Sequence, residues 1–192
     1  YSAMVGHQIK DVSPLAALTQ LQTLMLKQDN ISDISSLGTL VNLETFDVAG
    51  NQIDDVSVIQ GMTKLKNLNV SSNELQNVEV LKDLEGLESI DISDNQIKAL
   101  PDMSRLTRVT SFCAADNQLT DVEPLKDLAH LVKLDLSGNS GIQNVKALAG
   151  LIHLEKENTF LPETVNKDDL FAAIEVNKLL SRFNISHMKN SD

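Results

Sequence analysis

The sequence predicts an α/β solenoid, a right-handed superhelix of stacked coils with a parallel β-sheet on its concave side. Three observations lead to this fold class. One phrase, close to Asn-Gln-Ile-x-Asp-Val, recurs with a period of 22 residues along most of the chain. Alternating apolar and polar residues precede each copy, which is the pattern of a short strand with one buried face. Between the strands, apolar residues recur at every third position, the spacing of a 3₁₀ turn or short helix.

An Asn or Asp opens each copy of the phrase. These ladder positions are Asp29, Asn51, Asn73, Asn95, Asn117 and Asn139. An Asn side chain both donates and accepts hydrogen bonds. Because it stands where the chain leaves the strand, we expect it to pair with main-chain groups of the turn that would otherwise be buried without partners. A period of about 20–29 residues with Leu-x-x-Leu-x-Leu-x-x-Asn content is typical of leucine-rich repeats.

Each strand is predicted by two apolar residues that stand two positions apart and face the core. The expected pairs are Leu24/Leu26, Phe46/Val48, Leu68/Val70, Ile90/Ile92, Phe112/Ala114 and Leu134/Leu136. Parallel strands need a crossover connection, so the segments between them are expected to form a thin convex layer of 3₁₀ turns or short helices. Residues suited to cap these segments stand just before them, at Asp11, Asp33, Asp55, Asn77, Asp121 and Asn144.

The period predicts a leucine-rich repeat domain over residues 1–154, with six full repeats and partial repeats at its ends. His7 takes the ladder position in the degenerate first repeat. One residue is inserted at Ser140-Gly141, and the strand after it is expected to carry Glu157 and Thr159 at its core positions. These polar residues predict that the array stops there.

Residues 155–192 are predicted to form a C-terminal cap and tail. An exposed end of a solenoid must be covered, and the acidic residues after Asn166 are typical of a helix N-terminus. We expect a helix near 167–183 that packs on the last repeat. Residues 185–192 are expected to be a frayed tail.

Composition limits the classes of partner. The formal net charge of −11 argues against nucleic acid and anionic membranes and favours a basic partner. No apolar run is long enough to span a membrane, so no membrane insertion is expected. Cys113 is the only cysteine, which excludes an intrachain disulfide. The chain begins inside the repeat pattern without a secretion signal, so we expect a fragment or processed form. We also expect a monomer.

The register also predicts which side chains face outward on the concave side. The central outward column is expected to read Ala3, Met25, Asp47, Asn69, Asp91, Cys113 and Asp135. From this column and its neighbours, the candidate ligand-binding residues are Met25, Lys27, Asp47, Asn67, Asn69, Asp91, Asp94, Cys113, Asp116, Lys133 and Asp135. Only Tyr1 and Met25 approach the large side chains that dominate protein interfaces. Two interpretations stay open: an acidic shelf for a basic or polar protein ligand, or a solvated sheet whose ligand binds elsewhere.

No catalytic, cofactor-binding or metal site is predicted, and we do not expect an enzyme. Asp91, Asp94 and Asp116 could hold Ca²⁺, which prefers several carboxylate oxygens, but three surface acids are the simpler interpretation. Cys113 would need a basic neighbour to act as a nucleophile. The four histidines lie in different repeat elements, so an inert thiol is the preferred interpretation. No catalytic triad, phosphate loop or metal-binding motif occurs in the sequence.

These phrases resemble the leucine-rich repeats of bacterial internalins. The resemblance rests on Gln8-Ile9-Lys10-Asp11-Val12-Ser13-Pro14-Leu15 and on Asn42-Leu43-Glu44-Thr45-Phe46, and it covers about residues 4–154. It implies a secreted or cell-surface protein, with roles in adhesion or virulence, that grips a host or envelope protein with its concave face. Two internalin features, a helical N-terminal cap and an Ig-like domain after the repeats, are not found in this sequence. The repeats also resemble those of cytosolic regulators of protein phosphatase 1, so a cytoplasmic regulatory scaffold is the alternative.

Overall fold

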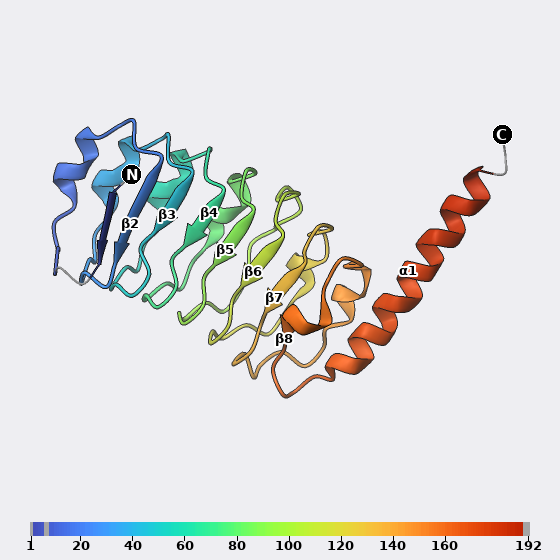
Figure 1. Ribbon diagram of the computed structural model, residues 1–192. Coiled ribbons are helices and arrows are strands. Elements are labelled where there is room, and N and C mark those ends of the chain that lie inside the picture. Colours follow the sequence, from blue (N-terminus) through green and yellow to red (C-terminus); the bar gives the residue numbers. More distant parts are fainter. Residues whose placement is uncertain (1, 6–7, 190–192) are drawn as a thin grey trace.

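The computed structural model describes residues 2–5 and 8–189, which form one open sheet flanked by a thin layer of 3₁₀ turns (Figure 1). All eight strands are parallel and lie in sequence order, as the fold class predicted. Their bounds are Ser2–Val5 (β1), Thr23–Lys27 (β2), Thr45–Asp47 (β3), Asn67–Asn69 (β4), Ser89–Asp91 (β5), Ser111–Cys113 (β6), Lys133–Asp135 (β7) and Thr159–Phe160 (β8).

The strand register confirms the expected separation of inward and outward side chains. Leu24 pairs with Phe46, and Phe46 pairs with Leu68, so equivalent residues of successive repeats stand side by side. These residues are at most 3 % exposed and belong to one continuous hydrophobic core. Outward residues such as Asp91 pair with their own copies on the other face of the sheet. An error of one residue would have exchanged the two faces.

The convex layer consists of 3₁₀ turns, as the three-residue spacing predicted. Their bounds are Ser13–Ala17 (η1), Ser35–Thr39 (η2), Ser57–Gly61 (η3), Glu79–Asp83 (η4), Glu123–Leu125 (η5), Lys146–Gly150 (η6) and Lys156–Asn158 (η7). The prediction that these polar residues are the N-caps is wrong by one position, because the N-cap of each turn is the apolar residue that follows, such as Val56, and it makes no side-chain cap hydrogen bond. The polar residues instead accept from the backbone N–H two positions later. Asp55 Oδ1, for example, accepts a hydrogen bond from the Ser57 backbone N–H at 2.8 Å.

The repeat between β5 and β6 departs from the prediction, because its convex segment contains turns but no 3₁₀ helix. In other repeats the residue before the 3₁₀ turn has ψ near zero, as at Val56 (φ −113°, ψ 13°). Leu100 takes that position here, and Pro101 follows it. A residue before proline is pushed towards extended ψ values, so the turn cannot start. The cap moves along the chain, and Asp102 Oδ1 accepts from the Ser104 N–H at 2.9 Å.

The ladder asparagines join consecutive repeats, as expected. Asn95 Oδ1 accepts from the Leu75 N–H at 2.9 Å, and its Nδ2 donates to the carbonyl oxygens of Val70 and Ile92, each at 3.1 Å. Asn51, Asn73, Asn117 and Asn139 repeat this pattern. Asp29 is buried, and its backbone N–H donates to Asn51 Oδ1. His7, the expected first position, lies outside the described residues.

At the C-terminal end, the array continues for one more short strand than predicted. Leu134 pairs with Thr159, and Asp135 pairs with Phe160. The predicted core position for Glu157 is wrong, because this residue lies exposed in η7. The buried Thr159 takes the core position beside Leu134, and Leu161, two residues later, also packs against the core. The chain therefore contains two more inserted residues before β8 than the single insertion recognised in the sequence.

The final element is a helix, α1, at Lys167–Lys189. It begins where predicted but continues through 184–189, most of the segment that we expected to fray; residues 190–192 lie outside the described part of the chain. Its first turns pack on η6 through Leu170 and Ile174, which are buried. Its later turns project past the end of the sheet (Figure 1). Among the described residues, no helix combines the length and apolarity needed to cross a bilayer.

Candidate functional site

The concave face presents the outward column that the register predicted. Cα pairing runs from Ala3 to Met25 and then through successive repeats to Asp135. Met25, Asn69, Asp91, Cys113 and Asp135 are half-buried, whereas Asn67 and Lys133 at the strand starts are exposed. The face is therefore a continuous ribbon of side chains with graded access to solvent, spread over neighbouring strands.

Local hydrogen bonds orient the carboxylates of this column. Asp91 Oδ1 accepts from the Ser93 N–H at 3.0 Å and from the Ser93 hydroxyl at 2.6 Å. Asp135 and Ser137 repeat the arrangement with the same distances. Such bonds hold each carboxylate in one direction before any ligand arrives, which reduces the entropy lost on binding.

The N-terminal half of the column is less acidic than the sequence indicated. Lys27 Nζ lies 2.8 Å from Asp47 Oδ2, across the β2–β3 pair. Asp47 is only 7 % exposed, and its Oδ1 accepts from the Ala49 N–H at 3.1 Å. A neutralised, covered carboxylate offers little to a basic ligand. The acidic character of the column therefore rests mainly on Asp91 and Asp135.

Phe160 ends the central column, and sequence reasoning missed it. It stands beside Asp135 in the register and is 53 % exposed. Lys167 Nζ lies 5.6 Å from the centroid of its ring. The register with one inserted residue would have placed Asn158 next to Asp135, so the only available signal was the large aromatic residue just after the expected end of the array. Tyr1, the other aromatic candidate, lies outside the described residues.

Cys113 lies between Asp91 and Asp135 on adjacent strands. Burial raises the pKa of its thiol above the ordinary value, and the two neighbouring carboxylates raise it further, against the lowering effect of hydrogen bonds from Ala115 and Ser93. A thiol with a raised pKa stays protonated at neutral pH and is a poor nucleophile. This environment favours the inert interpretation.

Asp94 and Asp116 project from the turns that follow β5 and β6. Both are exposed, and both have a positive φ of 52°. Asp tolerates this left-handed conformation better than most residues, which gives these positions a structural reason to be acidic. Across the described residues, no three His, Cys, Asp or Glu side chains are grouped so that they could hold a metal ion.

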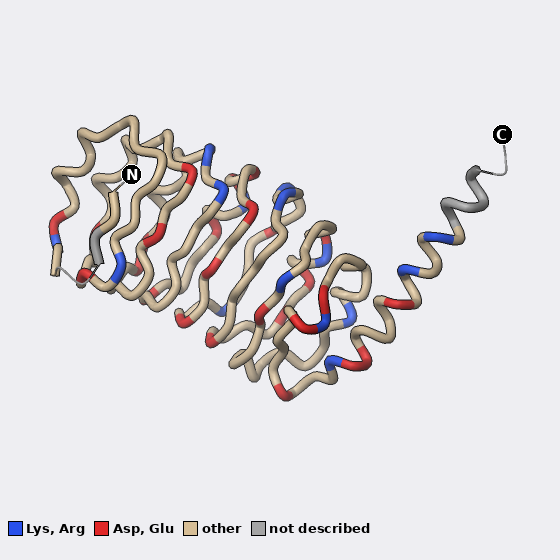
Figure 2. The backbone as a smooth tube through the Cα atoms, viewed as in Figure 1, with Lys and Arg blue, Asp and Glu red and all other residues tan. Residues whose placement is uncertain are grey.

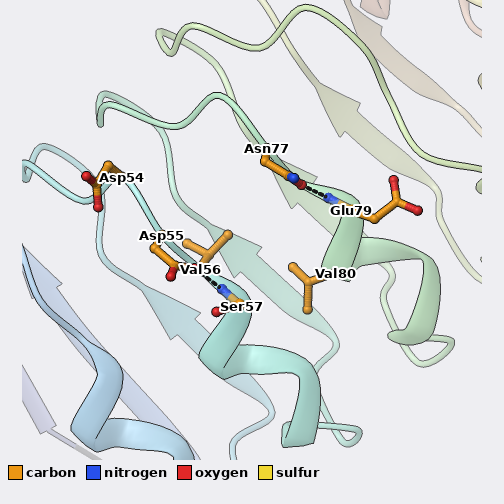
Figure 3. A pocket seen from close by; sticks show the side chains of 7 residues that line it. All are labelled: Asp54, Asp55, Val56, Ser57, Asn77, Glu79 and Val80. Atoms are coloured by element: carbon orange, nitrogen blue, oxygen red, sulfur yellow. Dashed lines mark hydrogen bonds between the residues drawn. The ribbon is translucent and has the colours of Figure 1, made fainter.

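The hollows outside the concave face are by-products of stacking. The one in Figure 3, about 550 Å³, lies between the starts of η3 and η4. Two of its polar side chains are bound to the 3₁₀ turns: Asp55 accepts from the Ser57 N–H, and Asn77 accepts from the Glu79 N–H at 2.7 Å. Side chains already engaged in this way offer few groups to a ligand.

Two histidines that we placed in separate elements are neighbours in the structure. The rings of His130 and His153 stack with their centroids 6.1 Å apart and their planes at 19°. They line an open hollow at the edge of the sheet together with Glu88, Arg108 and Glu155. An inserted residue hid this pairing in the sequence, because the two histidines are not separated by the repeat length.

Comparisons with known proteins agree with this geometry. Residues 19–61 and 107–150 match the family description "Leucine Rich repeats (2 copies)". Among solved structures, an internalin (inlF) from Listeria monocytogenes is 27 % identical over 83 % of this chain, with a TM-score of 0.68. Internalin C2 (inlC2) from the same species is 25 % identical over 83 % of the chain, also with a TM-score of 0.68. The chain is an internalin-like leucine-rich repeat protein.

The likeness to the internalins extends over part of their length. The chain spans 52 % of the inlF structure and 78 % of the inlC2 structure. A leucine-rich repeat protein of Leptospira interrogans, 24 % identical, shares the fold with a TM-score of 0.71 over 82 % of this chain and 40 % of its own. No curated protein sequence matches the chain. The leucine-rich repeats and the likeness to internalins support a protein-interaction module.

Proposed function

We propose that this internalin-like protein is a non-enzymatic binding module that acts at a bacterial surface or after secretion, and that it holds a protein ligand on its concave face. One observation supports the proposal most: oriented carboxylates and an exposed aromatic ring share one outward column. Asp91 and Asp135 are held by the serines two residues ahead, and Phe160 follows Asp135 in the register. The location rests on the internalin likeness alone.

The chemistry of this column defines the ligand that fits it. Carboxylates on neighbouring strands attract Lys and Arg side chains, and an exposed Phe offers an apolar or cation–π contact. Lys167 beside the ring shows that a cation is accommodated there. The proposed ligand is thus a protein segment with basic residues and at least one apolar side chain. The Lys27–Asp47 pair indicates that the N-terminal half contributes less to binding.

A capture experiment with a matched control tests the proposal. The chain and its Asp91→Lys/Asp135→Lys variant are used as baits on host-surface, bacterial-envelope and cytosolic protein fractions, and recovered proteins are identified by mass spectrometry. The control is Asp54→Lys/Asp127→Lys, which makes the same charge change at exposed positions outside the concave sheet. We expect one ligand to bind the chain and the control, and to bind the Asp91/Asp135 variant at least about tenfold more weakly.

Binding through these carboxylates should also weaken as salt rises, because the charges are partly exposed. Equal binding to both variants, with normal melting, would reject the concave carboxylates as the binding site. A ligand found only in cytosolic fractions would reject the proposed location.

A further inference from the structure

One face of α1 exposes a run of large apolar side chains. Val176, Leu179, Leu180 and Phe183 are 56 %, 62 %, 54 % and 59 % exposed. Their spacing of three, four and seven residues places them on one side of the helix. They account for four of the seven large hydrophobic residues that are exposed in the described part of the chain. Concentrated exposure of this kind marks an interaction surface.

This stripe lies on the side of α1 that does not contact the repeats. Leu170 and Ile174 face η6, and Asn177 Nδ2 donates to the Ala149 carbonyl oxygen at 2.8 Å, which ties the middle of the helix to the last repeat. The turns that carry Leu179 and Leu180 extend beyond that anchor (Figure 1). Capping the array therefore uses one face of α1 and leaves the stripe accessible.

The charges on α1 are segregated along its length. After Lys167, the first half carries Asp168, Asp169 and Glu175, and the second half carries Lys178 and Arg182 (Figure 2). Acid first and base last also suits the helix dipole. The same order makes the helix complementary to itself: an antiparallel copy sets each basic half beside an acidic half, whereas a parallel copy opposes like charges.

We propose that α1 is a self-association helix that binds α1 of a second copy of this chain in an antiparallel pair. A two-fold axis between Leu179 and Leu180 brings those leucines of the two copies together and sets each Val176 at the level of the other copy's Phe183. Glu175 then lies about half a turn from the level of the other copy's Arg182, on the same flank of the stripe. Such a pair differs from the monomer that we expected from the sequence.

The direction of α1 makes such a pair compatible with a chain of net charge −11. A 23-residue helix is about 35 Å long. In an antiparallel pair the two repeat arrays extend from opposite ends, so the acidic sheets stay apart. A bilayer is a poorer occupant, because a helix that lies on a membrane usually has a polar face rich in Lys and Arg, whereas the first half of α1 is acidic.

The size of the surface sets the expected strength. Specific interfaces bury about 1,200–2,000 Å² in total, and one pair of helices lies at the low end of that range. We therefore expect a dissociation constant of about 1–100 µM.

Sedimentation equilibrium of the chain between about 1 and 300 µM tests the pair directly. The average mass should rise from 21.0 kDa towards twice that value. Leu179→Glu/Leu180→Glu should remain monomeric throughout, with an unchanged circular dichroism spectrum. Val41→Glu, which alters an exposed apolar residue of the array (45 % exposed), should still dimerise. A wild-type chain that stays monomeric to 300 µM overturns the proposal, as does a Leu179/Leu180 variant that dimerises normally.

Charge exchange tests the antiparallel direction. Glu175→Arg and Arg182→Glu should each dimerise at least about tenfold more weakly alone, and an equal mixture of the two should recover association. Recovery follows because each altered residue then faces an opposite charge. Glu175 also contacts Lys178 of its own helix at 2.7 Å, so helicity is compared first. No recovery in the mixture overturns the antiparallel pair. Binding to anionic vesicles by a chain that sediments as a monomer would assign the stripe to a membrane and overturn it too.

Discussion

The repeat array and the C-terminal end use the same kinds of residue in opposite ways. Leu134 in β7 is 1 % exposed and stands between Phe112 and Thr159, the equivalent residues of the neighbouring strands, whereas Leu179 in α1 is 62 % exposed. In the array, the partner of each side chain is an equivalent residue of the next repeat. At the end, α1 packs on the last repeat with one face, and its outer face is apolar and exposed. The difference teaches that stacking, rather than hydrophobicity, decides which leucines stabilise this fold.

The largest expected effect comes from placing a charge at each of these two leucines. Leu134→Asp buries a carboxylate among apolar neighbours and should cost more than about 4 kcal/mol of unfolding free energy. Leu179→Asp should change it by no more than about 0.5 kcal/mol. Urea denaturation followed by circular dichroism measures both, at about 1 µM so that association does not contribute.

Hydrogen exchange then locates the damage in Leu134→Asp. Loss of protection should be concentrated in β6 to β8 and spare β2 to β4, because stability in a repeat array is largely local. If Leu179→Asp lowered the unfolding free energy as much as Leu134→Asp, α1 would be packed as tightly as the sheet.

An intermediate effect is expected from the asparagines of the two regions. Asn95→Ala removes an acceptor for the Leu75 N–H and a donor to two buried carbonyl groups, and so should cost about 3 kcal/mol. Asn177→Ala removes one bond to the Ala149 carbonyl oxygen at a partly buried site and should cost about 1 kcal/mol. The same urea titration compares them. A loss at Asn177 as large as that at Asn95 would mean that the array depends on α1.

Most of the array could be predicted from the sequence, because the period relates each side chain to its copy in the next repeat. The Leu24–Phe46–Leu68 core column and the Asn95 bonds follow from that relation alone. Pro101 shows its limit: the period predicts a 3₁₀ turn there, but the conformation required of Leu100 is incompatible with a following proline.

The candidate site was predicted only in part. The outward column followed from the register. The ion pair between Lys27 and Asp47 did not, because it depends on a lysine side chain reaching the neighbouring strand, which periodicity does not encode. Phe160 was missed because insertions before β8 break the period. The helix near 167–183 was expected to pack on the last repeat, but the sequence did not predict which face stays accessible, because the angle at which the helix leaves the array decides this.

The smallest expected effect separates the caps of the two regions by their response to pH. In the array, the Ser57 backbone N–H and then its hydroxyl lower the pKa of Asp55 below the ordinary value of 3.8. At the end, the amide oxygen of Asn166 accepts from the Asp168 N–H at 2.8 Å and does not titrate in this range. A carboxyl whose folded pKa is lowered stabilises the fold above about pH 4 and loses that contribution as pH falls through the folded value.

Asp55→Asn keeps the acceptor, as Asn77 does for Glu79 in the next repeat. The variant should melt like the wild type at pH 7 and lose slightly less stability between pH 5 and pH 3, as measured by thermal circular dichroism. The substitution keeps the hydrogen-bond acceptor and removes only the titratable carboxyl. Identical acid sensitivity in the two proteins would therefore place the pH response in other carboxylates.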